Sequence, residues 1–144
     1  MTTVRSAPAP SMDPGVLYAV MRLRQDVFVL EQECLYPDMD GRDLEPGAVQ
    51  FWAEAADGGV LATLRVLDDG DGVARVGRVA TAVPARGAGV AAELMQAALA
   101  TLRGPVVLDA QSHLEHWYAR FGFARDGAEF VEDGIPHVPM RRTP

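Results

Sequence analysis

An arginine followed by two glycines stands at the start of a run of good helix formers. The segment reads Arg86-Gly87-Ala88-Gly89-Val90-Ala91, and a strand-like stretch leads into it. A strand, a glycine turn and a helix start bring unpaired backbone N–H groups into one concavity, and the helix dipole adds positive potential there. Arg86 contributes a charged, planar fork that suits phosphate. These six residues therefore predict a cradle for a diphosphate.

Other interpretations of the same turn can be compared with this one. A Walker A loop needs a lysine, and the sequence contains none. A dinucleotide fold needs Gly-x-Gly-x-x-Gly in a parallel β-α-β unit, whereas this turn follows two strands expected to be antiparallel. A third interpretation is a turn that binds an acyl-coenzyme A, and the alternative to any ligand is an ordinary strand-to-helix turn in which the glycines serve packing.

The strand before the turn changes its phase. Ala74 and Val76 share one face, Val79 and Thr81 share the other, and the change falls at Gly77-Arg78. Such a switch at a glycine is typical of a β-bulge, which kinks a strand and opens its edge.

Several blocks resemble the GNAT N-acetyltransferase superfamily. Arg86-x-x-Gly89-x-Ala91 is similar to its Arg/Gln-x-x-Gly-x-Gly/Ala signature, and QSHLEHWYARFGF (111–123) is similar to its second motif, with Gln111 where asparagine is usual. With LRQDVFVLEQECLYPDMDG and EDGIPHVPM, the likeness covers residues 17–142 and is closest to the ElaA-like branch. It implies acetyl-CoA as co-substrate, in contact with Val79, Ala80, Thr81, Arg86, Gly87, Ala88, Gly89, Val90, Ala91, Gln111 and Tyr118.

Acetyl transfer to an amine needs a neutral amine, a stabilised oxyanion and a proton for the leaving thiolate. Amides of the bulged strand near Val79–Thr81 are placed to polarise the thioester carbonyl. By the resemblance, Tyr118 is the general acid, and a neutral phenol can donate to a forming thiolate. The alternative is a core tyrosine, because Tyr118 shares an apolar stripe with Leu114, Trp117 and Phe121.

The general base is open between several groups. The bulged strand carries Arg78 where many relatives keep a glutamate. His113 and His137 are the leading candidates, with His113 favoured because it begins the helix that carries Tyr118. Glu31, Glu33 and bulk water are the alternatives.

The acceptor is expected to be a cationic amine, from a small molecule or a peptide, bound by Phe28, Glu31, Gln32 and Glu33. Residues 33–48 form an acidic loop, which is either solvated or an acidic mouth for that cation. No metal is expected, since His113-x-x-His116 lacks a completing carboxylate. The single cysteine, Cys34, has no activating neighbour in sequence.

These groups need an α+β fold with a mixed sheet flanked by helices and a splayed strand pair, as in GNAT proteins. Residues 1–144 are expected to form one domain, in which residues 1–12 are a flexible lead-in or a short edge strand. The remaining pattern predicts helices at 14–30, 89–102 and 112–121, with Ser112 and Glu115 as a capping box. Strands are expected at 49–55, 60–67, 73–83, 106–110, 123–131 and 137–142.

The composition of the chain limits its possible partners and cellular compartment. The net charge of −7 argues against nucleic acid, and no apolar run approaches the ~20 residues of a membrane span. One cysteine and no signal-peptide pattern favour the cytoplasm. The oligomeric state is open, with a homodimer among the forms considered. The rival function is a non-catalytic acyl-CoA-binding sensor or partner module on the same fold.

Overall fold

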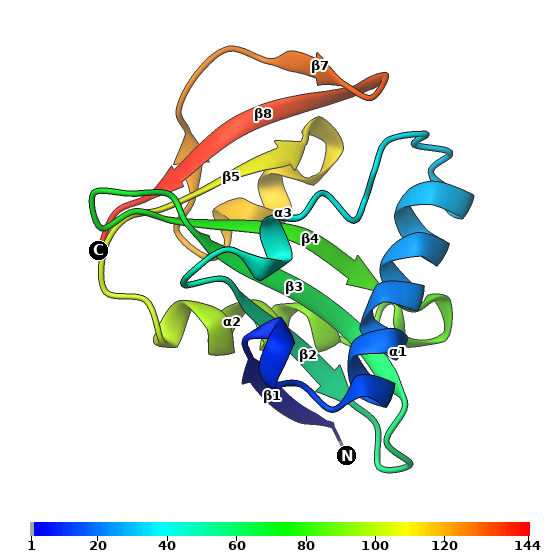
Figure 1. Ribbon diagram of the computed structural model, residues 1–144. Helices are drawn as coiled ribbons and strands as arrows, with labels where there is room; N and C mark the ends of the chain where they lie inside the picture. The colour runs from blue at the N-terminus through cyan, green and yellow to red at the C-terminus, as the bar shows by residue number, and fades with distance from the viewer. Residues whose placement is uncertain (1) are drawn as a thin grey trace.

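A mixed eight-stranded sheet runs through the protein, with helices on both faces (Figure 1). The computed structural model describes residues 2–144. The sheet order is β1-β2-β3-β4-β5-β8-β6, with β7 paired to β8; only β4–β5 is parallel. The strands are Thr3–Ala7 (β1), Val49–Glu54 (β2), Val60–Asp68 (β3), Ala74–Thr81 (β4), Val106–Gln111 (β5), Ala124–Arg125 (β6), Phe130–Glu132 (β7) and Ile135–Arg142 (β8). The predicted fold class is confirmed.

The first helix starts as its sequence indicates. Asp13 accepts hydrogen bonds from the amides of Gly15 and Val16, and a proline occupies the first turn of α1 (Pro14–Arg24). The chain then continues as the π-helical segment η2 (Gln25–Glu31). The helical span expected to Leu30 is therefore present, but its second half is wound more widely than an α-helix.

The two faces of the sheet bury different helices. On β2, Phe51 packs in the cluster that includes Leu94 of α2 (Val90–Ala100), whereas the next residue, Trp52, packs with Val20 of α1. Alternation along the strand thus sends α1 and α2 to opposite faces. The short α3 (Glu115–Ala119) contributes Tyr118 to the α2 side. The remaining short helices are η1 (Ala9–Ser11), η3 (Arg42–Leu44), η4 (Val83–Ala85) and η5 (Ser112–Leu114).

Three local expectations need correction or detail. The capping box is wrong: Ser112 opens η5, and its hydroxyl donates to Glu129 at 2.8 Å instead of capping an amide. The strand expected at 123–131 is divided into β6 and β7, because β8 pairs with each in turn. At the N-terminus, β1 pairs with β2 as an edge strand, and Met12 is buried beside α1.

Candidate active site

One cavity of about 1290 Å³ extends along β4 and β5. Its lining includes most of the side chains and turns to which the sequence pointed. Of the predicted site residues, it takes in Phe28, Glu31, Gln32, Val79, Ala80, Thr81, Arg86, Gly87, Gly89, Val90, Ala91, Gln111, His113, Tyr118 and His137. Ala88 and Glu33 are exposed and lie outside the lining.

A bulge in β4 shapes one wall of this cavity. Arg65 pairs with Gly77 and Thr63 pairs with Ala80, so two residues of β4 oppose the single residue between them on β3. One of the two, Arg78, has a φ of 53°, a conformation that non-glycine residues rarely adopt. The phase switch at Gly77-Arg78 is thus a bulge, as predicted.

From Val76, just before the bulge, β4 separates from β5. The two strands pair only at Ala74–Val106 and Arg75–Val107, while β5 stays paired with β8 as far as Gln111. The edge of β4 that faces β5 therefore lacks a neighbouring strand from Val76 onward, over the part of the sheet that lines the cavity. Backbone polar groups left open in this way need a partner from water or from a ligand.

The turn before α2 presents a row of free amides. Gly87 and Gly89 have φ values of 82° and 79°, and a Cβ on either would meet no atom within 4 Å. Across residues 2–144, the amides of residues 87–92 find no hydrogen-bond acceptor. Open space above six N–H groups at a helix N-terminus fits a diphosphate.

Arg86 is engaged by a carboxylate at this turn. Its guanidinium donates to both oxygens of Glu31 at 2.7 and 2.6 Å, and its Nε donates to the Thr81 carbonyl at 3.1 Å. The hydrogen bond from Arg86 lowers the pKa of Glu31, so this carboxylate stays charged. The sequence assigned Arg86 to the phosphate and Glu31 to the acceptor. In the structure the two side chains form an ion pair that joins η2 to the turn.

Tyr118 is buried on the cavity wall, and two aromatic rings pack against it. It contacts Trp117 and Phe123 edge-on, with ring centroids 4.9 and 6.3 Å away. Burial raises the pKa of Tyr118 to about 12. The hydroxyl therefore keeps its proton at neutral pH. Tyr118 both packs in the hydrophobic core and lines the cavity, so the two interpretations of this residue do not exclude each other.

The two histidines differ in how they are held. His137 is buried on β8 beside Gln111 of β5, and its ring stacks on Phe130. Its Nδ1 lies 2.7 Å from the Ile135 carbonyl, which can only accept, so a neutral ring carries its proton on Nδ1 and leaves Nε2 as the acceptor. His113 is exposed in η5. Only His137 therefore has an orientation fixed by its surroundings.

Two amides connect the strand end to the π-helical segment. The Gln111 side chain donates to Gln32 Oε1 at 3.2 Å.

Nearby, Cys34 also lines the cavity, and burial together with the charge of Asp133 raises its thiol pKa. A raised pKa keeps sulfur protonated, in agreement with the inert role expected for this cysteine.

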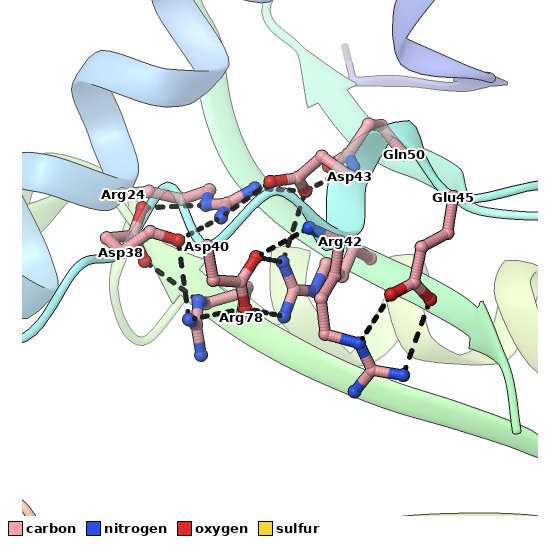
Figure 2. Close-up of polar contacts among 9 residues, drawn as sticks. Arg24, Asp38, Asp40, Arg42, Asp43, Glu45, Gln50 and Arg78 are labelled. Carbon is pink, nitrogen blue, oxygen red and sulfur yellow. Dashed lines mark hydrogen bonds and ion pairs between the residues drawn. The ribbon is translucent and has the colours of Figure 1, made fainter.

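The acidic loop is largely neutralised, which sequence reasoning missed. Figure 2 shows Asp38 and Asp43 on either side of Arg24, whose side chain has no exposed surface; Arg24 Nε lies 3.0 Å from Asp38 and its Nη1 lies 2.7 Å from Asp43. Asp40 holds Arg65 through two hydrogen bonds of 2.8 and 2.7 Å. The expectation of a solvated loop is wrong at Asp38 and Asp43, because buried arginines pair with both.

The same network anchors the bulge. Arg78 Nη2 donates to Asp40 at 3.2 Å, and Arg78 Nε lies 2.8 Å from Asp38, at an angle too bent for a hydrogen bond. Because these aspartates also bind Arg24 and Arg65, the loop, α1 and the bulged strand are held as one unit (Figure 2). Arg24, Arg65 and Arg78 lie on a helix and two strands far apart in the sequence, so their spacing gives no signal for such a cluster.

A model described as an acetyltransferase (GNAT) domain matches residues 23–144. The chain belongs to the GNAT family. A UPF0039 protein of Mycobacterium tuberculosis is 47% identical to this GNAT protein over 143 residues, covering 96% of this chain and 92% of the relative. The protein ElaA of Escherichia coli is 39% identical over 135 residues, covering 88% and 86%.

Solved structures place the chain in the same branch. An acyl-CoA N-acyltransferase from Pseudomonas aeruginosa superposes on this GNAT protein with a TM-score of 0.92 and 38% identity, covering 99% of this chain and 100% of that one. The crystal structure of Escherichia coli ElaA gives a TM-score of 0.91 at 35% identity, with 99% of each chain covered. The predicted resemblance to the ElaA-like branch is confirmed.

Over residues 2–144, no three His, Cys, Asp or Glu side chains gather closely enough to hold a metal ion. Within the same range, no helix has the length and apolar character to cross a membrane.

Proposed function

We propose that this GNAT protein is a cytoplasmic N-acetyltransferase that transfers an acetyl group from acetyl-CoA to an amine by direct attack within a ternary complex. One observation carries the proposal. A single cavity combines a row of free amides at the start of α2, an unpaired strand edge, a protonated phenol and a histidine with a free acceptor nitrogen. Each of these groups meets one requirement of the reaction.

The chain's own groups fit the parts of acetyl-CoA in order. The amides of residues 87–92 bind the diphosphate, and the open edge of β4 offers backbone partners to the pantetheine amides. At the bulge, amides near Val79–Thr81 turn toward the thioester carbonyl and stabilise the oxyanion. Acetyl-CoA supplies the activated acyl group, and the protein supplies orientation and charge stabilisation.

His137 is the better candidate for the base. The Ile135 carbonyl holds its Nδ1 proton, which leaves Nε2 free to accept a proton from the attacking amine. Packing against Phe130 holds the ring plane. His113 lines the same cavity but is exposed and has no such support, which favours His137, the reverse of the order that the sequence suggested.

Tyr118 serves the leaving sulfur. A phenol with a pKa of about 12 is protonated at neutral pH, and Tyr118 lines the cavity. Since that pKa lies above the ~8.5 of a thiol, hydrogen-bond donation to the departing sulfur outweighs complete proton transfer. The proton that the amine gives up is the one that the thiolate finally takes.

The amine enters between η2 and the β7–β8 hairpin in this proposal. Phe28, Glu31 and Gln32 line the cavity from η2, and Glu132 and Asp133 line it from the hairpin. Because Glu31 is paired with Arg86, it is the carboxylates of Glu132 and Asp133 that favour a cationic amine, from a small molecule or a peptide.

Release of free CoA thiol during incubation with acetyl-CoA and a panel of amines tests the proposal. An amine-free sample measures hydrolysis, and mass spectrometry identifies the acetylated amine. We expect thiol release that depends on at least one amine. Tight binding of acetyl-CoA without amine-dependent release would instead support the non-catalytic acyl-CoA-binding module.

A further inference from the structure

Six arginines line the cavity, and five of them are already neutralised. The five form ion pairs with carboxylates at 2.6–3.1 Å: Arg42 with Glu45, Arg65 with Asp40, Arg75 with Asp69, Arg78 with Asp38, and Arg86 with Glu31. Arg120 is the sixth, and within residues 2–144 it has no ion pair and no hydrogen bond from its side chain. Arg120 therefore has a guanidinium that is free to bind a negative group of a ligand in the cavity, in addition to the diphosphate at the amides.

Arg120 is also held in place by an aromatic ring. Its Cζ lies 5.9 Å from the centroid of the Trp117 ring, within the range of a cation–π interaction. Trp117 is itself fixed by edge-on contacts with Tyr118 and Phe121, each at a centroid distance of 4.9 Å. This packing orients an exposed cation along a wall that also includes Leu114.

The charge available along the cavity matches the charge of coenzyme A. The free amides of residues 87–92 suit its diphosphate without any side-chain cation, because Arg86 is occupied by Glu31. Coenzyme A carries one further phosphate, on the 3′-hydroxyl of the ribose. A planar guanidinium binds such a group through two parallel hydrogen bonds.

We propose that Arg120, supported by Trp117, binds the 3′-phosphate of coenzyme A and makes the protein selective for donors that carry it. This rests on the proposed function, since it assumes that the cavity takes an acyl-CoA. It goes further by assigning a specificity residue and by excluding phosphopantetheine thioesters without the nucleotide as efficient donors.

Calorimetric titration with coenzyme A and with 3′-dephospho-coenzyme A tests this assignment. The wild-type protein should bind coenzyme A about 10- to 100-fold more tightly than the dephospho form, as expected for one charged hydrogen-bonded group. Arg120→Gln should remove that preference by weakening coenzyme A alone, and Arg120→Lys should restore part of it. Arg103→Gln, an exposed arginine outside the cavity, is the matched control and should change neither affinity.

Different results would overturn the proposed function and the 3′-phosphate assignment. If the wild-type protein binds neither ligand, the proposed function fails, and this inference fails with it. If it binds coenzyme A and Arg120→Gln keeps the preference over the dephospho form, or weakens both ligands equally, only the 3′-phosphate assignment is overturned.

Discussion

Replacing Gly89 by glutamate places a carboxylate in front of the free amides. Gly89 is the N-cap residue of α2, with a φ of 79°, and a Cβ built there meets nothing within 4 Å. The new side chain thus has room, and the cost to the fold is that of a left-handed non-glycine residue, about 1–2 kcal/mol. An anion at a helix N-terminus is stabilised by about 0.3–1 kcal/mol, which offsets part of this cost. Gly89→Glu should therefore fold with slightly reduced stability.

The effect on acetyl-CoA binding should be much larger. At about 5 Å and an effective dielectric constant of about 20, two like unit charges repel by roughly 3 kcal/mol. A diphosphate carries more than one charge, and the carboxylate also competes for the amides of residues 87–92. A single 3 kcal/mol term already corresponds to about a 100-fold loss of affinity. We expect a loss of at least this size.

Calorimetric titration with acetyl-CoA, beside thermal unfolding of the same samples, measures both effects. Gly58→Glu is the matched control, because Gly58 has a φ of 89° and open space around its Cβ, but lies in the β2–β3 turn outside the cavity. It should lose similar stability and keep its affinity. Wild-type affinity in a folded Gly89→Glu protein would refute the assignment of this turn to the diphosphate.

Two further predictions concern the base and the buried acidic cluster. His137→Gln should lower kcat/KM by about 10²–10⁴-fold, the usual contribution of a general base, and His113→Gln should leave it near the wild-type value; the reverse pattern would return the base to His113. Burial raises the pKa of Asp43, but the hydrogen bond and charge of Arg24 and the charge of Arg65 outweigh this and hold it below the ordinary value. Its contribution to stability is therefore full above pH ~4 and is lost as the pH falls below that. Asp43→Asn should lower the free energy of unfolding by about 3–5 kcal/mol at pH 7 and flatten its fall in acid, as urea titrations at pH 7 and pH 3 would show; parallel curves for the two proteins would contradict this.

The parts of the fold with a local signal were predictable from sequence. Asp13-Pro14 marks the start of α1, and the phase switch at Gly77-Arg78 marks the bulge, because capping chemistry and side-chain alternation are local properties. The capping box at Ser112 failed because its hydroxyl found a tertiary partner, Glu129. A distant acceptor can outcompete a local amide, and the spacing of two residues does not reveal it.

The polar part of the site was predictable only in outline. Motif residues such as Gly89 and Tyr118 do line one cavity. The pairing of Arg86 with Glu31 joins residues 55 positions apart, and the burial of Arg24 among aspartates depends on tertiary packing. Charge pairing over such separations has no periodicity, so sequence reasoning treated these carboxylates as free.

The most direct test of the account compares the wild-type protein with Tyr118→Phe in the thiol-release assay, using the best amine from the panel. The substitution keeps the ring that packs on Trp117 and removes only the O–H. Tyr18→Phe, on the exposed face of α1, is the matched control. We predict a turnover about 10²–10⁴-fold lower for Tyr118→Phe with CoA affinity little changed, and no change for Tyr18→Phe. Full turnover in the Tyr118→Phe protein would contradict the account of this cavity as a catalytic site built around that hydroxyl.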